Sequence, residues 1–280
     1  MRIKVISDST CDLSREILEK YDIDLVPLIV TKGEEEFIDG VTITPADIFA
    51  HVAAGGAICT TAARNAGVYH DVFAKYAGEY DGIIHINIGA EFSSSHQNAC
   101  IAAADFDNVR VVDSRNLSTG QGLVVLRAVD LAPETNDLDT LKAQLEDYST
   151  RIEASFVLDR LDYMVKGGRC SSATALGANL LHLKPCIEVK DGRMNVGKKY
   201  RGHIEKCLAA YIKDRLDGRS DLDNTRAILT YTDLPEAVLD DVRKQIKTLG
   251  NFTEVLECVA GCTVSCHCGP GTLGIMLVRK

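Results

Sequence analysis

The chain has 280 residues, of which 46% are hydrophobic and 25% charged, a composition typical of globular proteins. Its formal charge of −9 is concentrated in residues 1–150, where 24 Asp and Glu outnumber 11 Lys and Arg, and this acidic half argues against nucleic acid as a partner. No apolar run approaches the roughly 18 residues of a membrane span, and no signal peptide is visible, so we expect a cytoplasmic protein.

Strand-like and helix-like segments alternate in the first half of the chain. A helix start is predicted at Thr44-Pro45-Ala46-Asp47, which offers a cap, a first-turn proline and an acid at the third helical position, and Gly55-Gly56 ends that helix. The other predicted elements are strands at 4–6, 83–88 and 109–112 and helices ending at 18 and spanning 65–80, 94–104, 122–131 and 138–152. This alternation predicts a parallel sheet, whose ligands bind beyond the carboxyl ends of the strands.

The second half has a different pattern. A short strand at 156–158 leads into a helix that ends at Gly167-Gly168, and Asp191-Gly192 is a strong hairpin signal. Further elements are helices at 176–183, 203–216 and 235–249 and strands at 184–190, 193–200, 226–231, 253–259 and 274–278. Since the chain exceeds the usual size of one domain, we expect an α/β fold with an N-terminal parallel-sheet α/β domain (1–155) and a C-terminal α+β domain (156–280).

Three serines follow the predicted strand at 83–88. Gly89 interrupts that strand, and Ser93, Ser94 and Ser95 open an alanine-rich helix. Serines at a helix start accept hydrogen bonds from unpaired backbone N–H groups. The same N–H groups and the positive end of the helix dipole attract small anions. The serines therefore predict either helix caps or a site for a carboxylate or a phosphate.

Three of the ten cysteines lie close to His267, at positions 262, 266 and 268, a pattern that could hold zinc. The segment Gly261 to Cys268 also alternates as a strand does, which would place the three thiols on one face and His267 on the other. We therefore expect small buried thiols and no metal. The lack of a secretion signal predicts that they are reduced.

A basic stretch lies in the second half and is either a solvated surface or a docking surface for an acidic partner. Its members are Lys184, Lys190, Arg193, Lys198, Lys199, Arg201 and Lys206.

Several enzyme templates are missing from the sequence. No Gly-x-Gly-x-x-Gly or Walker lysine loop follows a predicted strand, so no nucleotide cofactor is expected. Ser93 is not in a Gly-x-Ser-x-Gly nucleophile elbow. The segment Gly269-Pro270-Gly271 could bind an anion through backbone N–H groups or form a tight turn.

A series of short motifs occurs in the order found in one known family. They are Ser7-Asp8-Ser9-Thr10-Cys11-Asp12-Leu13, Thr60-Thr61, Phe92-Ser93, Val112-Asp113-Ser114-Arg115, Leu161-Asp162-Tyr163-Met164-Val165-Lys166-Gly167-Gly168-Arg169, Lys184-Pro185, Arg201-Gly202 and His267-Cys268-Gly269-Pro270-Gly271. Over essentially its whole length the chain resembles the DegV proteins. The resemblance implies a non-catalytic cytoplasmic protein that binds a long-chain fatty acid, such as palmitate, in a tunnel between two domains.

The resemblance also implies partners and site residues. Some family members hand the fatty acid to an ATP-using kinase subunit that phosphorylates its carboxylate, and we expect such a subunit and transient contact with a membrane surface. Thr61 and Ser93 are expected to hold the carboxylate, with His267 nearby, and Arg169 and Arg201 to lie close to the head-group opening. The remaining expected ligand-binding residues are Thr60, Ser94 and Gly269.

The chain departs from the family pattern at several hydroxyl positions. Thr60-Thr61 leads into Ala62-Ala63-Arg64, where the family has Gln-Pro after its hydroxyl pair, and Gly89-Ala90 stands where two serines are frequent. The family often has Gly-Thr where this chain has Ser94-Ser95. Two other functions therefore stay open: an acyl-processing enzyme that uses Ser93 and His267, or a binder of another small amphiphilic acid.

Overall fold

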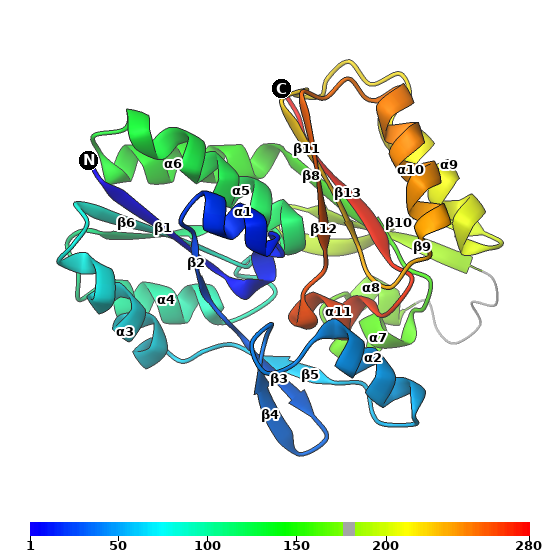
Figure 1. Cartoon of the computed structure of the whole chain (residues 1–280), viewed down its shortest axis with the longest axis horizontal. Helices are drawn as coiled ribbons and strands as arrows, with labels where there is room; N and C mark the ends of the chain where they lie inside the picture. The colour runs from blue at the N-terminus through cyan, green and yellow to red at the C-terminus, as the bar shows by residue number, and fades with distance from the viewer. Residues whose placement is uncertain (176–182) are drawn as a thin grey trace.

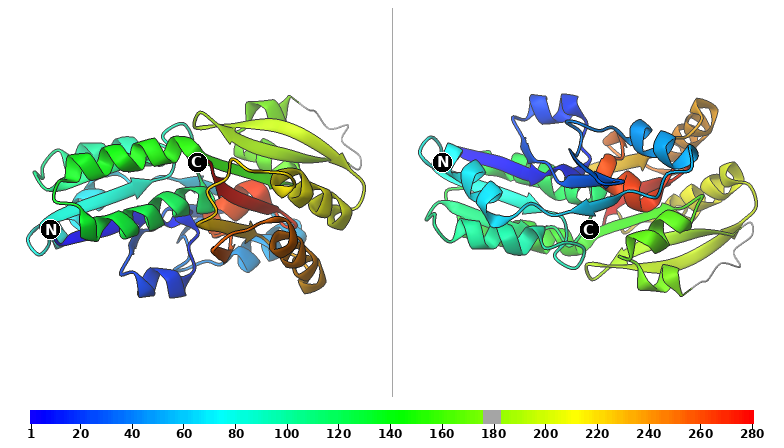
Figure 2. Two further views of the ribbon diagram at one scale, coloured as in Figure 1. Left: turned by 90° about the horizontal axis from the view of Figure 1, so that it is seen from above. Right: turned by 90° about the horizontal axis from the view of Figure 1, so that it is seen from below.

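The computed structural model describes residues 1–175 and 183–280, and the helix predicted at 176–183 falls almost wholly outside them. Two sheets lie side by side along the long axis of the molecule (Figures 1 and 2). The expected α/β class, with a parallel sheet in the first half and a mixed sheet in the second, is confirmed. No helix within the described residues is long and apolar enough to cross a membrane.

The first half forms a parallel sheet between two layers of helices. Its strand order is β2-β1-β6-β7, and each neighbouring pair is parallel. The strands are β1 (Ile3–Asp8), β2 (Asp24–Val26), β6 (Gly82–Asn87) and β7 (Val109–Asp113). The covering helices are α3 (Ala66–Ala77) and α4 (Ser95–Ala103) on one face and α5 (Ser118–Leu131) and α6 (Leu138–Arg151) on the other (Figure 1). Most residues of β1, β6 and β7 are buried because helices cover both faces of the sheet.

The second half forms a mixed sheet in the order β10-β9-β8-β13-β11-β12. Only β11 and β12 pair in parallel; the other pairs are antiparallel. The strands are β8 (Ile152–Val157), β9 (Leu183–Lys190), β10 (Arg193–Arg201), β11 (Arg226–Tyr231), β12 (Glu254–Val259) and β13 (Leu273–Val278). One face packs on α9 (Ile204–Leu216) and α10 (Glu236–Leu249). The predicted hairpin turn at Asp191-Gly192 is confirmed.

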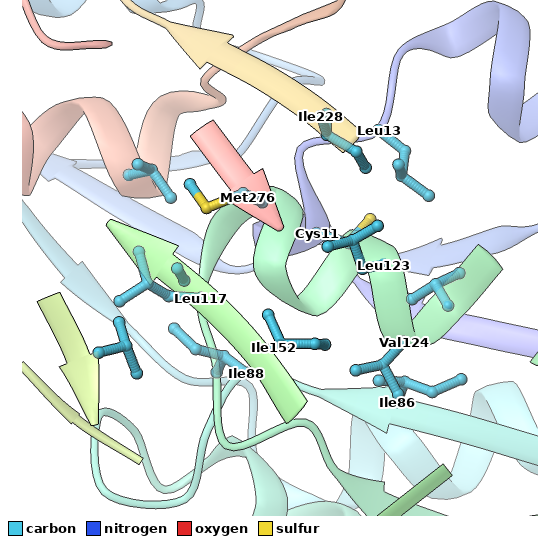
Figure 3. Close-up of a cluster of buried hydrophobic side chains, with 14 of the residues drawn as sticks. Cys11, Leu13, Ile86, Ile88, Leu117, Leu123, Val124, Ile152, Ile228 and Met276 are labelled. Atoms are coloured by element: carbon cyan, nitrogen blue, oxygen red, sulfur yellow. The ribbon is translucent and has the colours of Figure 1, made fainter. Parts of the chain in front are cut away.

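The opposite face of the mixed sheet packs on the first half of the chain. Ile228 of β11 and Met276 of β13 belong to the same buried cluster as Leu123 of α5 and Ile86 of β6 (Figure 3). The two halves therefore share one continuous apolar core. The predicted boundary after residue 155 falls inside β8, which runs through this junction.

A small antiparallel sheet, β4-β3-β5, was not predicted. It consists of β3 (Ile29–Lys32), β4 (Glu35–Ile38) and β5 (Thr60–Ala62), and it lies beside α2 (Pro45–Ala53) (Figure 1). Its strands have only three or four residues, and two of them carry adjacent polar residues in place of apolar alternation. The predicted start of α2 is confirmed, with a complete capping box between Thr44 and Asp47.

Several predicted bounds differ from the structure. A 3₁₀ helix occupies Ser9–Cys11, and Asp12 has a left-handed backbone with φ 50°, so α1 spans only Arg15–Lys20. Helix α5 begins at Ser118, before the predicted start at residue 122. Its first turn is buried but polar, so the sequence shows no apolar periodicity there. The strand predicted at 156–158 is the end of β8 and is followed by α7 (Asp162–Gly167) and α8 (Ser171–Thr174). A second 3₁₀ helix spans Ala132–Glu134.

The strand predicted around His267 is wrong, because Cys262–Cys268 is a helix, α11. Cys262 and Cys266 lie one turn apart and pack against the small sheet, whereas Cys268 packs into the shared core. Helix α11 is buried on several sides, so its sequence lacks the polar face that marks a surface helix. Its pattern of residues therefore resembles the alternation of a strand. Among the described residues, no group of His, Cys, Asp and Glu is arranged to hold a metal ion. All ten cysteines are free thiols.

Candidate ligand-binding site

A cavity of about 410 Å³ opens between the two halves of the chain. Its walls come from both halves and are mainly apolar, with six polar side chains among the lining residues. The apolar lining consists of Leu28, Ala62, Ala63, Ile88, Phe92, Leu117, Met164, Met194, Val264 and Cys268, and the polar lining of Thr61, Ser93, Ser94, Arg169, Thr263 and His267. Its volume is within the range of small-molecule sites.

A much smaller apolar chamber, of about 20 Å³, adjoins the cavity. Leu117, Val264 and Cys268 line both spaces, and the smaller one continues to Phe156 and Met276 of the mixed sheet. The apolar end of the site therefore points into the core that the two halves share.

Thr61, Ser93 and His267 all line this cavity. Thr61 comes from β5, Ser93 from the loop before α4, and His267 from α11. Thr61 Oγ1 lies 2.8 Å from His267 Nε2, a hydrogen bond. Ser93 Oγ accepts the backbone N–H of Ser95, the first residue of α4, at 3.2 Å, and Ser93 also lines the site.

His267 is a neutral imidazole at pH 7. Burial, aided by the nearby Arg169 guanidinium, lowers the pKa of His267 to about 4. Its Nδ1 is buried without a hydrogen-bond partner in the described structure and faces Gly167 at the end of α7. The close approach explains why a glycine occupies position 167.

Arg169 is an exposed residue at the mouth of the cavity, and its charge acts on His267. Its Nη1 donates to the Gly167 carbonyl at 2.8 Å and its Nε to the Phe92 carbonyl at 3.4 Å, across the two halves. Ser94 is exposed beside the same mouth.

Three other predicted ligand-binding residues do not line the cavity. Thr60 is exposed on β5 and pairs with Thr31. Gly269, with φ 72°, packs against the Tyr163 ring and donates its N–H to the Ser265 carbonyl, so it ends α11. Arg201 is exposed at the end of β10, roughly 20 Å along the strand from the lining residue Met194.

Two buried acidic side chains from the first half cap α11, which carries His267. Asp39 Oδ1 accepts the N–H of Cys262 at 3.0 Å, and its Oδ2 accepts the Thr263 hydroxyl at 2.7 Å. Asp12 Oδ1 accepts the N–H of Gly261 at 3.0 Å. Sequence analysis missed this role, because the acids lie more than two hundred residues from the helix they cap. These caps fix the imidazole relative to Thr61.

Because of Asp12, the free energy of unfolding should fall as pH rises. Burial, with the Asp39 charge nearby, raises the pKa of Asp12 to about 8, whereas the unfolded carboxyl titrates near 4. The folded state favours the protonated, neutral Asp12 carboxyl. The stabilisation that Asp12 contributes is therefore complete below pH 4 and is lost as pH rises toward 8. Asp12→Asn should flatten this decline by at most about 1.4 kcal/mol per pH unit. Urea unfolding at pH 5 to 8 measures it, and parallel profiles for variant and wild type would contradict it.

A larger cavity, of about 530 Å³, lies on a different part of the junction, but its lining is ion-paired. Arg219 contacts Glu153 at 3.1 Å, and Arg215 pairs with Glu188. Charged side chains make up much of this lining, whereas the lining of the smaller cavity is mainly apolar, so the smaller cavity is the stronger site for an apolar ligand.

Fold and site together define a two-lobed α/β protein with a mainly apolar cavity between its halves and a hydroxyl–imidazole pair in the cavity wall. A family model described as "Uncharacterised protein, DegV family" matches residues 2–280. The chain is 34% identical over 283 residues to a DegV domain-containing protein of Clostridium perfringens, covering 100% of this chain and 99% of that one. It therefore belongs to the DegV family.

Solved structures agree with this assignment. The chain superposes on a structure described as showing fatty acid binding of a DegV family protein from Thermus thermophilus, with a TM-score of 0.88, 30% identity and full coverage of both chains. The fold also matches DegV of Bacillus subtilis, described as a fatty acid binding protein, with a TM-score of 0.82, 24% identity and full coverage of both chains.

Proposed function

We propose that this protein binds one long-chain fatty acid, such as palmitate, with its carboxylate at Thr61, Ser93 and His267. The observation that carries the proposal is the cavity itself, whose lining is mainly apolar but includes the hydrogen-bonded pair Thr61 and His267. The Thermus thermophilus relative described as binding a fatty acid, at 30% identity over the full chain, supports the same ligand class.

The apolar chain supplies most of the binding free energy in this proposal. Burial of a sixteen-carbon chain at about 0.8 kcal/mol per methylene contributes about 11 kcal/mol before the costs of association. Each hydrogen bond to the charged carboxylate adds about 1.5–3 kcal/mol. The cavity therefore sets affinity, and the hydroxyl and imidazole groups set the orientation of the head group.

The polar groups of the cavity suit a carrier that releases its ligand. His267 is neutral, and the Arg169 guanidinium already donates to two carbonyl groups at the mouth. A carboxylate held by neutral donors stays more available for transfer than one clamped by a bidentate arginine.

We expect Ser93→Ala and Thr61→Ala each to weaken palmitate binding by about 1–3 kcal/mol. The double variant should lose less than the sum of the two single losses, because both hydroxyls share one carboxylate. Calorimetry with palmitate on the four proteins measures this coupling. Strict additivity, or no effect of Ser93→Ala, would place the carboxylate elsewhere.

We further propose that the protein presents the bound acid to a separate ATP-dependent kinase subunit. Family resemblance supports this, and Arg201 is free to meet such a partner because it lies away from the cavity. Arg201→Ala should leave palmitate affinity within twofold of wild type and lower the phosphorylation rate with the cognate kinase. Equal loss of both would instead implicate Arg201 in the ligand site.

The geometry does not favour the acyl-processing alternative. A serine nucleophile needs a base within about 2.6–3.2 Å. In the described residues His267 Nε2 bonds to Thr61 and Ser93 Oγ to Ser95, so serine and histidine are not paired.

A further inference from the structure

The larger cavity between the two halves, of about 530 Å³, forms where strands β8 and β9 separate. Their pairing ends at Ser155 and Glu188, although β8 begins at Ile152 and β9 continues to Lys190. Residues of both diverging ends line the cavity, together with the turn before α5 and the end of α6. The gap in the sheet therefore opens a space within the size range of small-molecule sites.

Cationic side chains outnumber carboxylates in the lining of this cavity. The carboxylates are Glu153, Glu188 and Asp191, and the cations are Arg115, Lys190, Arg215, Arg219 and Arg279. Five cations thus face three carboxylates, and Asp221 contacts Arg219 from outside the lining, which leaves one positive charge unbalanced. In a chain with a net charge of −9, a cavity of this sign favours an anionic ligand.

Two cations of the lining share one carboxylate. Lys190 Nζ lies 2.9 Å from Glu188, and Arg215 pairs with the same side chain. One carboxylate neutralises only one of these two charges. Arg215 Nε is also buried without a hydrogen-bond partner in the described structure. The cavity wall therefore holds cationic donors that the protein's own acids do not use.

Arg115 is held at the cavity wall by an unusual backbone conformation. Its φ is 53°, in the left-handed region, and Asp113 Oδ1 accepts its N–H at 2.8 Å. Non-glycine residues adopt this conformation at a cost and are concentrated at functional sites. Among the described residues, the Arg115 guanidinium forms no hydrogen bond, and the Asp191 carboxylate lies 3.8 Å from it. The Val112-Asp113-Ser114-Arg115 motif therefore presents unused guanidinium donors to this cavity.

The rest of the lining suits a phosphorylated molecule that is rich in hydroxyl groups. Guanidinium groups bind phosphate oxygens through paired N–H donors. The side-chain oxygens of Ser149, Thr150, Ser155 and Asn116 can accept hydrogen bonds from sugar hydroxyls. None of the described lining residues is aromatic, so the cavity offers no surface on which a nucleobase could stack. These features favour a sugar phosphate over a nucleotide.

We propose that this cavity binds a sugar phosphate, with the phosphate group at Arg115, Lys190 and Arg215. The inference goes beyond the proposed function, because this cavity and the proposed fatty-acid cavity have no described lining residue in common. Either proposal can therefore fail without the other.

Calorimetry on the purified protein tests this proposal with glucose 6-phosphate, ribose 5-phosphate, glucose and inorganic phosphate. We expect one or both sugar phosphates to bind at one site per chain, at least about tenfold more tightly than inorganic phosphate. Glucose should show no binding. The affinity for the sugar phosphate should fall as NaCl is added, because salt screens the attraction between the phosphate and the cations.

Arg115→Gln should weaken binding of the sugar phosphate about tenfold, because it removes a charged donor without breaking a hydrogen bond of the free protein. Lys190→Gln, which leaves Arg215 paired with Glu188, should also weaken it. Arg193→Gln is the matched control, since Arg193 is exposed on the same hairpin and does not line the cavity. Thermal unfolding verifies that the three variants are folded.

Three results would each overturn the inference. They are binding of neither sugar phosphate, equal affinity for a sugar phosphate and for inorganic phosphate, and equal losses in Arg115→Gln and Arg193→Gln. Unchanged affinity in both Arg115→Gln and Lys190→Gln would likewise place the ligand elsewhere.

Discussion

Gly167→Ala should reduce palmitate affinity by tenfold or more while leaving the protein folded. A Cβ at position 167 would overlap His267 Nδ1, and the ring atoms on either side are also in contact distance. The imidazole would have to move, which breaks its hydrogen bond to Thr61 at the carboxylate site. Overpacking of this kind costs about 1–3 kcal/mol. The backbone at 167 is helical, so alanine adds no conformational strain.

Gly78→Ala is the matched control for this variant. Gly78 ends α3 with φ −87°, and a Cβ there meets nothing within 4 Å. Calorimetry with palmitate and thermal unfolding should show normal binding for Gly78→Ala and weakened binding for Gly167→Ala. Normal binding by Gly167→Ala would mean that His267 is not needed where the structure places it.

Asp39→Ala should lower the free energy of unfolding by about 3–5 kcal/mol, because it removes several buried charge-assisted hydrogen bonds. The Asp39 carboxylate accepts from Cys262 N, from the Thr263 hydroxyl and from Ser9 Oγ at 2.8 Å. Its loss leaves these donors unpaired in the core, and α11 loses its cap. We expect weaker palmitate binding as well, since α11 carries His267.

Asp47→Ala is the comparison for Asp39→Ala, because Asp47 is also a helix-capping carboxylate. Asp47 belongs to the exposed capping box of α2, where loss of a cap costs about 1 kcal/mol. Urea unfolding of both variants measures the difference. Similar losses for the two would contradict the view that burial makes the α11 caps important.

The sequence predicted three of the four strands of the parallel sheet, and it missed the three-residue β2. The runs at 83–88 and 109–112 are rich in Ile and Val and end close to where β6 and β7 end. The cluster of Thr61, Ser93 and His267 came from family resemblance, since residues from three distant segments have no local pattern in common. The structure brings these three to one cavity, and their ligand role stays a proposal.

The elements that sequence analysis missed are those whose stability comes from distant partners. Strand β5 is Thr-Thr-Ala, which has no strand-like alternation, and it forms because β3 pairs with it. Helix α11 begins where Asp12 and Asp39 accept its first N–H groups, so its cap lies elsewhere in the chain. The helix and strand propensities of the residues in a segment do not include the stabilisation that it gains from distant parts of the chain.

The most direct test of the central claim is native mass spectrometry of the freshly purified protein, followed by organic extraction and identification of the lipid. We expect about one long-chain fatty acid per chain, and we expect delipidated protein to rebind palmitate with the same stoichiometry. Protein that carries no stoichiometric fatty acid and does not bind palmitate on titration would contradict fatty-acid binding as its function.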